Sequence, residues 1–143
     1  MSAPDTARHL VALVADGSPY GARTTRDVLA RTGVRRIVEV LDGAEALSAL
    51  ADHKPDLLVL DWQLPVITAR EIVAMARDAS RSHAPAMPVI VTMPEPTARA
   101  VSEAMALEVD AILARPFSPK DLRLRLERIV RARASTGAAR PNG

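Results

Sequence analysis

The amino-acid sequence predicts an α/β fold, a doubly wound parallel sheet of five strands with five helices. Five short runs rich in valine, isoleucine and leucine recur along the chain, each too short for a typical helix and bounded by Asp, Gly or Pro. Longer segments with helical signals lie between them, and this alternation is typical of β–α units that build a parallel sheet. The predicted strands are residues 10–15, 36–40, 56–60, 88–92 and 111–114.

N-cap signals mark the starts of four predicted helices. A serine followed by proline places a capping side chain before a residue that is preorganised for the first turn. A threonine with a glutamate three positions later predicts a capping box, and an aspartate with the same spacing is a related start. These signals are Ser18-Pro19, Ser118-Pro119, Thr68 with Glu71, and Asp42 with Glu45.

The last helix is predicted from its cap and its length. Leu122, Leu124 and Leu126 alternate with arginines as they would in a strand, but Leu122, Leu126 and Ile129 also follow helical spacing. Beyond this helix little remains that could be buried. We therefore expect one domain over residues 10–133, an N-terminal extension over 1–9 and a disordered tail over 134–143.

The composition indicates one globular domain with an aliphatic core. Of the 143 residues, 48% are hydrophobic and 25% are charged, but only 2% are aromatic. The absence of cysteine excludes disulfides, thiolate metal sites and cysteine nucleophiles. No apolar run approaches the roughly 18 residues of a membrane span, so we expect a cytoplasmic protein with no membrane partner.

Two acids, Asp16 and Asp61, follow the first and third predicted strands. In the doubly wound strand order 2-1-3-4-5 these strands are neighbours, and their carboxyl ends meet at the edge where α/β proteins bind ligands. Either acid alone could simply cap a loop. Two close carboxylates repel each other unless a cation lies between them, and a hard ion such as Mg²⁺ prefers oxygen ligands. The pair therefore predicts a cation site.

Other chemistry has little support in the sequence. The three histidines, His9, His53 and His83, lie on separate elements, and no glycine-rich nucleotide motif occurs. We interpret the arginines of the last helix as a solvated face and do not expect nucleic-acid binding, which would favour aromatic side chains for stacking. A phosphohydrolase of the haloacid-dehalogenase type would need a second acid where Gln63 stands.

Five segments carry a family pattern in their order along the chain: "VADGSP", "DGAEAL", "PDLLVLDWQLP", "MPVIVT" and "ARPFSPKDL". Together with the five β–α units, they resemble the response-regulator receiver domain of two-component signalling, of the chemotaxis type. The resemblance covers about residues 10–130. It implies a flavodoxin-like sheet in the order 2-1-3-4-5 and a role in signal transduction.

The resemblance also implies roles for individual residues. Asp61 corresponds to the phosphoacceptor, whose carboxylate attacks a phosphoryl group carried by a histidine kinase or phosphotransfer protein. Asp16, Asp61 and the backbone carbonyl of Gln63 correspond to the ligands of Mg²⁺, which offsets charge at the phosphoryl group. Arg115 takes the place of the family's lysine and keeps its positive charge.

The sequence departs from the family pattern at several positions. Gly17 stands where a second acid normally contacts the metal, so Mg²⁺ binding is expected to be weak or absent. The switch hydroxyl aligns with Met93, whereas Thr92 is one residue earlier and should point to the opposite face of an extended strand unless a bulge intervenes. The switch position therefore falls on Thr92 or Met93, and Ile112 replaces the usual aromatic residue.

The sequence therefore predicts a single-domain response regulator of a phosphorelay that accepts a phosphoryl group on Asp61 and signals through protein contacts. Its expected partners are a sensor histidine kinase or phosphotransfer protein and a downstream protein. A dimer would use the fourth helix, fifth strand and fifth helix. Beyond self-phosphorylation and auto-dephosphorylation, no enzyme activity is expected. The alternative, favoured by Gly17, Met93 and Ile112, is a pseudo-receiver that docks without phosphorylation.

Overall fold

The computed structural model describes residues 8–139, with the backbone alone for Val130 and residues 133–139. Five parallel strands form one sheet in the order β2-β1-β3-β4-β5, which confirms the predicted topology. The strands are β1 (Val11–Ala15), β2 (Arg36–Val40), β3 (Leu57–Asp61), β4 (Val89–Met93) and β5 (Ala111–Ala114).

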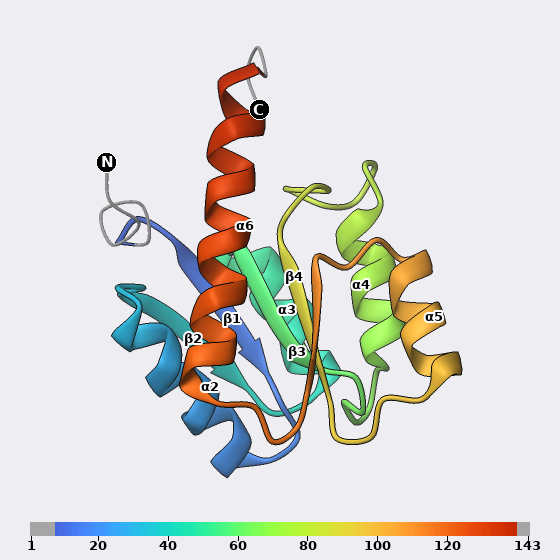
Figure 1. The fold of residues 1–143 in the computed structure, drawn as a ribbon. Coiled ribbons are helices and arrows are strands. Elements are labelled where there is room, and N and C mark those ends of the chain that lie inside the picture. Colours follow the sequence, from blue (N-terminus) through green and yellow to red (C-terminus); the bar gives the residue numbers. More distant parts are fainter. Residues whose placement is uncertain (1–7, 140–143) are drawn as a thin grey trace.

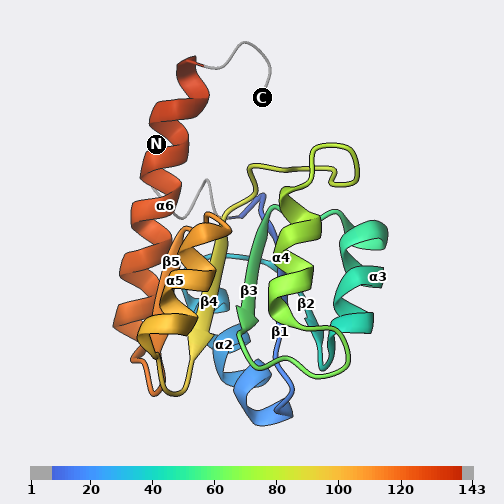
Figure 2. The same cartoon turned by 90° about the vertical axis from the view of Figure 1, so that its right-hand side faces the viewer.

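Five helices cover the two faces of the sheet. Helices α2 and α6 pack on one face, and α3, α4 and α5 pack on the other (Figures 1 and 2). The predicted helical spacing of the last segment is confirmed, because Leu122, Leu126 and Ile129 are buried while Leu124 is exposed. The helices are α2 (Pro19–Arg31), α3 (Gly43–His53), α4 (Ala69–Arg77), α5 (Ala98–Ala106) and α6 (Pro119–Ala139).

The strands supply side chains alternately to two core layers, as the two-residue period of a strand requires. In β1, Leu13 and Ala15 join the layer beneath α3, α4 and α5. Ala12 and Val14 join the layer beneath α2 and α6. Because both faces are covered, the central strands are buried along most of their length, and polar side chains are placed where the strands end.

All four predicted helix starts are confirmed, at Ser18, Asp42, Thr68 and Ser118. Helix α5 has a further N-cap, Thr97, which the sequence did not suggest because no acid follows it three positions later. At the start of α6, the Ser118 N–H donates to Asp121 and lowers the pKa of that carboxyl below its ordinary value. The local signals therefore fix where each helix begins.

The element ends differ in detail from the predicted boundaries. Strands β3 and β4 each end one residue later than predicted, so Asp61 and Met93 belong to the strands themselves. The tail was predicted to begin at residue 134, but α6 continues through Gly137 to Ala139, and no proline interrupts it before Pro141. Residues 1–7 and 140–143, which hold most of the predicted extension and the end of the tail, lie outside the described residues.

Arg77, at the end of α4, joins three segments at the amino-terminal edge of the sheet. Its Nη1 donates to the carbonyls of Pro85 (3.0 Å) and Met87 (2.5 Å), in the loop that leads into β4. Its Nη2 donates to the Glu108 carbonyl (2.8 Å) and the Asp110 carboxylate (3.2 Å), just before β5. One guanidinium thus holds the two loops that position the last two strands.

Among the described helices, none is both long enough and apolar enough to cross a membrane.

Candidate functional site at the carboxyl edge of the sheet

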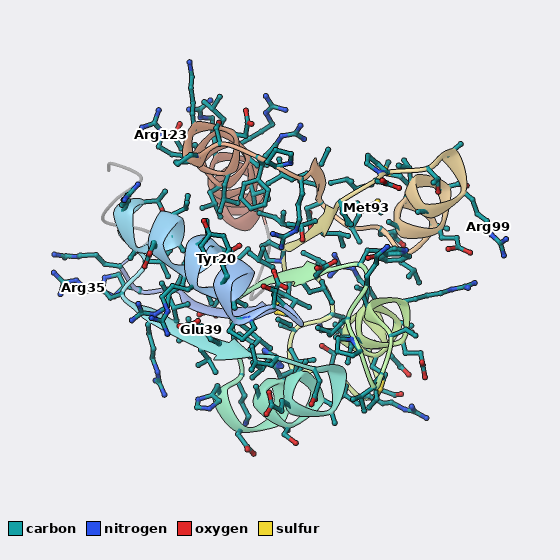
Figure 3. The ribbon with its side chains drawn as sticks, turned by 90° about the horizontal axis from the view of Figure 1, so that it is seen from below. Tyr20, Arg35, Glu39, Met93, Arg99 and Arg123 are labelled. Atoms are coloured by element: carbon teal, nitrogen blue, oxygen red, sulfur yellow. The ribbon has the colours of Figure 1, made fainter. Side chains whose placement is uncertain are left out.

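Asp16, Asp61, Thr92 and Arg115 lie at the ends of four neighbouring strands. Asp16 follows β1 directly, Asp61 pairs with Thr92 across the β3–β4 ladder, and Arg115 follows β5. Each of the four is two positions after a residue of the core layer beneath α2 and α6, so they share that side of the sheet. Figure 3 shows the molecule from this edge, with Tyr20 of α2 and Met93 of β4 labelled.

The guanidinium of Arg115 connects two strand ends. Its Nη2 forms an ion pair with Oδ2 of Asp16 at 2.5 Å. Its Nε and Nη2 both donate to Oγ1 of Thr92, at 3.2 and 3.0 Å. The Phe117 ring lies 5.5 Å from the guanidinium carbon, within the range of a cation–π contact. In the part of the chain that the structure describes, the remaining nitrogen, Nη1, has no acceptor.

Asp16 is almost fully enclosed, with 3% of the residue exposed. Its Oδ1 accepts a hydrogen bond from the Ser18 N–H at 2.9 Å, and its Oδ2 is the atom that pairs with Arg115. Gly21 in the first turn of α2 makes this placement possible, because a Cβ there would lie 2.5 Å from Oδ2. Both oxygens of this carboxylate are therefore already engaged.

Asp61 has a much more open environment. The residue is half-buried, and its Oδ1 accepts one hydrogen bond, from the Gln63 N–H at 2.9 Å. Among the described residues, no arginine, lysine or histidine forms an ion pair with Asp61. The intervening Trp62, the single tryptophan of the chain, is half-buried against the layer of α3, α4 and α5. Asp61 is thus the carboxylate of the pair that can accept a new partner.

The loop after Asp61 passes close to Gly17. Pro65, Val66 and Ile67 form a tight turn in which the Ile67 N–H donates to the Pro65 carbonyl at 3.0 Å and Val66 has a φ of 75°. A positive φ is strained for a β-branched residue. A Cβ on Gly17 would lie 3.0 Å from Cδ of Pro65. A side chain at position 17 would therefore press against this loop.

The positions of Thr92 and Met93 follow the sequence-based expectation. The β3–β4 register is continuous as far as Asp61 and Thr92, so no bulge interrupts the described ladder. Thr92 faces the Arg115 side, whereas Met93, 1% exposed, is buried in the layer of α3, α4 and α5. Ile112 packs against that same layer. Whether Thr92 or Met93 acts in a switch stays a prediction.

The described residues do not fit a magnesium site well. Magnesium takes nearly octahedral oxygen ligands, usually including one or two carboxylates. Here the carboxylate of Asp16 is occupied by Arg115 and by a backbone N–H, and Gly17 adds no ligand. No group of three or more acidic or imidazole side chains that could hold a metal is present among the residues described. The predicted metal role of Asp16, Asp61 and Gln63 therefore has no structural support beyond proximity.

Sequence reasoning did not foresee the contact of Arg115 with Asp16 and Thr92. The sequence instead predicted a cation between the two acids and a contact of Arg115 with the phosphoryl group. Asp16, Thr92 and Arg115 are all visible in the sequence, but they are far apart in it. Only the register of β1, β3, β4 and β5 shows that they meet.

Comparison with known proteins identifies the family. The family described as "Response regulator receiver domain" matches residues 12–127. The chain is 29% identical over 128 residues to a chemotaxis protein CheY homolog of Campylobacter jejuni, covering 89% of this chain and 97% of that protein. It is 31% identical over 118 residues to chemotaxis protein CheY1 of Helicobacter pylori, covering 80% and 92%.

Solved structures agree with this assignment. Chemotaxis protein CheY4 of Vibrio cholerae has a TM-score of 0.74 at 25% identity, covering 83% of this chain and 97% of that one. A CheY-like receiver domain protein from Methanospirillum hungatei shares the fold, with a TM-score of 0.79 at 18% identity over 89% and 98% of the two chains.

The chain belongs to the response regulator receiver family and has the CheY fold. Receivers of this type are modules of two-component signalling that generally bind Mg²⁺ at the phosphorylation site. Asp61, at the end of the third strand, lies in the segment that the family match covers.

Proposed function

We propose that this protein is a response regulator of the cytoplasm that accepts a phosphoryl group on Asp61. The observation that carries the proposal is the contrast between the two acids. Asp16 is enclosed and paired with Arg115, whereas Asp61 is half-buried with one hydrogen bond from a backbone N–H. A carboxylate that is anchored but not neutralised has the environment that a nucleophile needs.

The proposed reaction is an in-line displacement at phosphorus. An Oδ atom of Asp61 forms a bond with phosphorus, while the bond from phosphorus to the donor's histidine nitrogen breaks and its electron pair leaves with the imidazole. The phosphoryl oxygens then carry negative charge at the edge of the sheet where Arg115 lies. Nη1 of Arg115 is the guanidinium nitrogen that remains to donate a hydrogen bond to them, and charge-assisted bonds of this kind are strong.

The proposed partners are a histidine kinase or phosphotransfer protein as donor and a downstream protein as target. Helix α5, strand β5 and helix α6 form the proposed output surface, which would also serve in a dimer. Met105 on α5 and Leu124 on α6 support this role, since they are 59% and 42% exposed. Phosphorylation can bias such a surface only if the phosphoryl group binds two conformations with different affinity.

A second candidate, a pseudo-receiver that docks without phosphorylation, rests on two specific observations. Met93 is fully buried at the position where the family places a switch hydroxyl, so it has no group to bond a phosphoryl oxygen. Arg115 is already held by Asp16 and Thr92. In this alternative the Arg115 contacts are permanent and the surface is constitutively ready to bind.

Incubation with acetyl phosphate, followed by intact mass measurement, separates the two candidates. The proposed function predicts a gain in mass of one phosphoryl group in the wild type and no gain in Asp61→Asn. Asp42→Asn is a matched control, because Asp42 is a helix cap at another loop of the same edge. An unmodified wild type under conditions that modify another receiver would favour the pseudo-receiver.

A further inference from the structure

The structure points to a specific replacement: the guanidinium of Arg115 takes the place of the divalent cation of the receiver site. We propose that the site around Asp16 and Asp61 does not bind Mg²⁺, and that anions bind at Asp61 in its absence. The second half of this proposal rests on the proposed phosphoacceptor role of Asp61. The first half concerns the free protein and stands by itself.

The first support is that both oxygens of Asp16 already have partners within the chain. Its Oδ2 pairs with Arg115 at 2.5 Å and its Oδ1 accepts the Ser18 N–H at 2.9 Å, in a residue that is 3% exposed. A metal ion at this enclosed carboxylate would have to compete with a guanidinium that remains charged at any accessible pH. The neutralising charge that a metal brings to Asp16 is thus already supplied from within the chain.

The second support is that neighbouring side chains fix the position of the Arg115 guanidinium beside Asp16. The fork of an arginine can bond two acceptors at once, whereas a lysine ammonium is a point charge on a flexible stem. Thr92 Oγ1 accepts from both Nε and Nη2, and the Phe117 ring lies under the guanidinium. Because Thr92 is 1% exposed, its hydroxyl has little competition from water. Thr92 is therefore a positioning residue for Arg115.

The third support is that the chain has little room for the missing acid. Gly17 stands where the family's second acid would be, and a Cβ there would lie 3.0 Å from Pro65 Cδ. The contact is tight without being prohibitive, so an aspartate would require a small shift of the loop after Asp61. The absence of an acid at Gly17 therefore agrees with a site in which the Arg115 guanidinium, and not a metal ion, neutralises Asp16.

Magnesium titration followed by Trp62 fluorescence tests the proposal directly. Trp62 is the single tryptophan of the chain and is adjacent to Asp61, so an ion bound there should change its emission. The wild type should show no saturable response through the millimolar range. The double variant Gly17→Asp with Arg115→Lys, which regains the acid and loses the fork, should show a saturable quench. Circular dichroism establishes that the double variant is folded.

Beryllofluoride, a phosphoryl analogue, tests the second half. Its effect on Trp62 emission should be the same with and without EDTA in the wild type. The affinity for beryllofluoride should fall about tenfold or more in Thr92→Val, because this variant loses the acceptor that orients Arg115. The affinity should recover in Thr92→Ser. A purely structural role for Thr92 would instead change stability equally in both variants and leave beryllofluoride affinity unchanged.

Each outcome has a definite meaning. A saturable magnesium response in the wild type that Asp16→Asn abolishes would overturn the proposal. So would the absence of a response in both the wild type and the folded double variant, because Arg115 would then not be what excludes the ion. A beryllofluoride effect that EDTA removes overturns the second half. If no anion or phosphodonor modifies Asp61 under any condition, the proposed function and this second half fail together, while the magnesium titration still decides the first.

Discussion

Two arginines at opposite edges of the sheet use the same chemistry for different purposes. Arg77, at the amino-terminal edge, directs three of its four hydrogen bonds to backbone carbonyls. The guanidinium of Arg115, at the carboxyl edge, instead donates to the side chains of Asp16 and Thr92. The two side chains are similarly enclosed, with 17% and 25% exposed.

The difference in acceptors indicates a structural role for Arg77 and a functional role for Arg115. Backbone carbonyls cannot move away from Arg77 without unfolding the loops that precede β4 and β5. The carboxylate and the hydroxyl that hold Arg115 lie at the edge where α/β sheets bind ligands, and one of its nitrogens still has capacity to donate there. Arg77 should therefore dominate stability measurements, and Arg115 should dominate measurements of anion binding.

Arg77→Ala should cause the largest loss of stability, about 3 kcal/mol, because it leaves several partly buried acceptors without a charged donor. Urea unfolding followed by circular dichroism measures this loss. Arg99→Ala is the control, since the Arg99 side chain is 88% exposed and should contribute less than about 0.5 kcal/mol. Similar losses in the two variants would show that Arg77 is not a structural link.

Asp16→Ala should lower stability by a smaller amount, about 2 kcal/mol, because Arg115 is partly exposed and can turn toward water when its partner is lost. A double-mutant cycle with Arg115→Ala should give a coupling energy of about 1–2 kcal/mol. Asp27→Ala, which removes a 54% exposed carboxylate, is the matched control. Additive effects of the two substitutions would contradict the ion pair as drawn.

Gly21→Ala should give the smallest of these losses, about 1 kcal/mol. Alanine improves the helix by roughly 1 kcal/mol, but its Cβ would lie 2.5 Å from Oδ2 of Asp16, and overpacking of this kind costs about 1–3 kcal/mol. Gly17→Ala, where the nearest contact is Pro65 at 3.0 Å, should be tolerated better. The ranking would be wrong if Gly21→Ala stabilised the protein in urea.

Much of the fold could be predicted because its signals are local. Short apolar runs gave the strands, and the caps at Ser18 and Thr68 gave helix starts that the structure confirms. The predicted end of the last helix was wrong because a weakly polar, alanine-containing segment can continue a helix that is already anchored. The segment has no proline before Pro141, and its one glycine, Gly137, weakens a helix by only about 1 kcal/mol.

The site was predictable only in part. Asp16 and Asp61 could be placed together because residues at the ends of adjacent parallel strands share an edge. The Arg115 contacts could not be foreseen, since they depend on the register of four strands and on the space left by Gly21. The sequence pattern thus predicted which residues lie at the same edge of the sheet. Which of them form hydrogen bonds with each other is seen only in the three-dimensional structure.

The most direct test of the central claim is to locate the phosphoryl group on the chain. After incubation with acetyl phosphate, borohydride reduction converts an aspartyl phosphate to homoserine, which peptide mass spectrometry assigns to one position. Homoserine is expected at position 61 in the wild type and in Asp42→Asn. Recovery of unmodified Asp61, or of homoserine at Asp16 or any other acid, would contradict it.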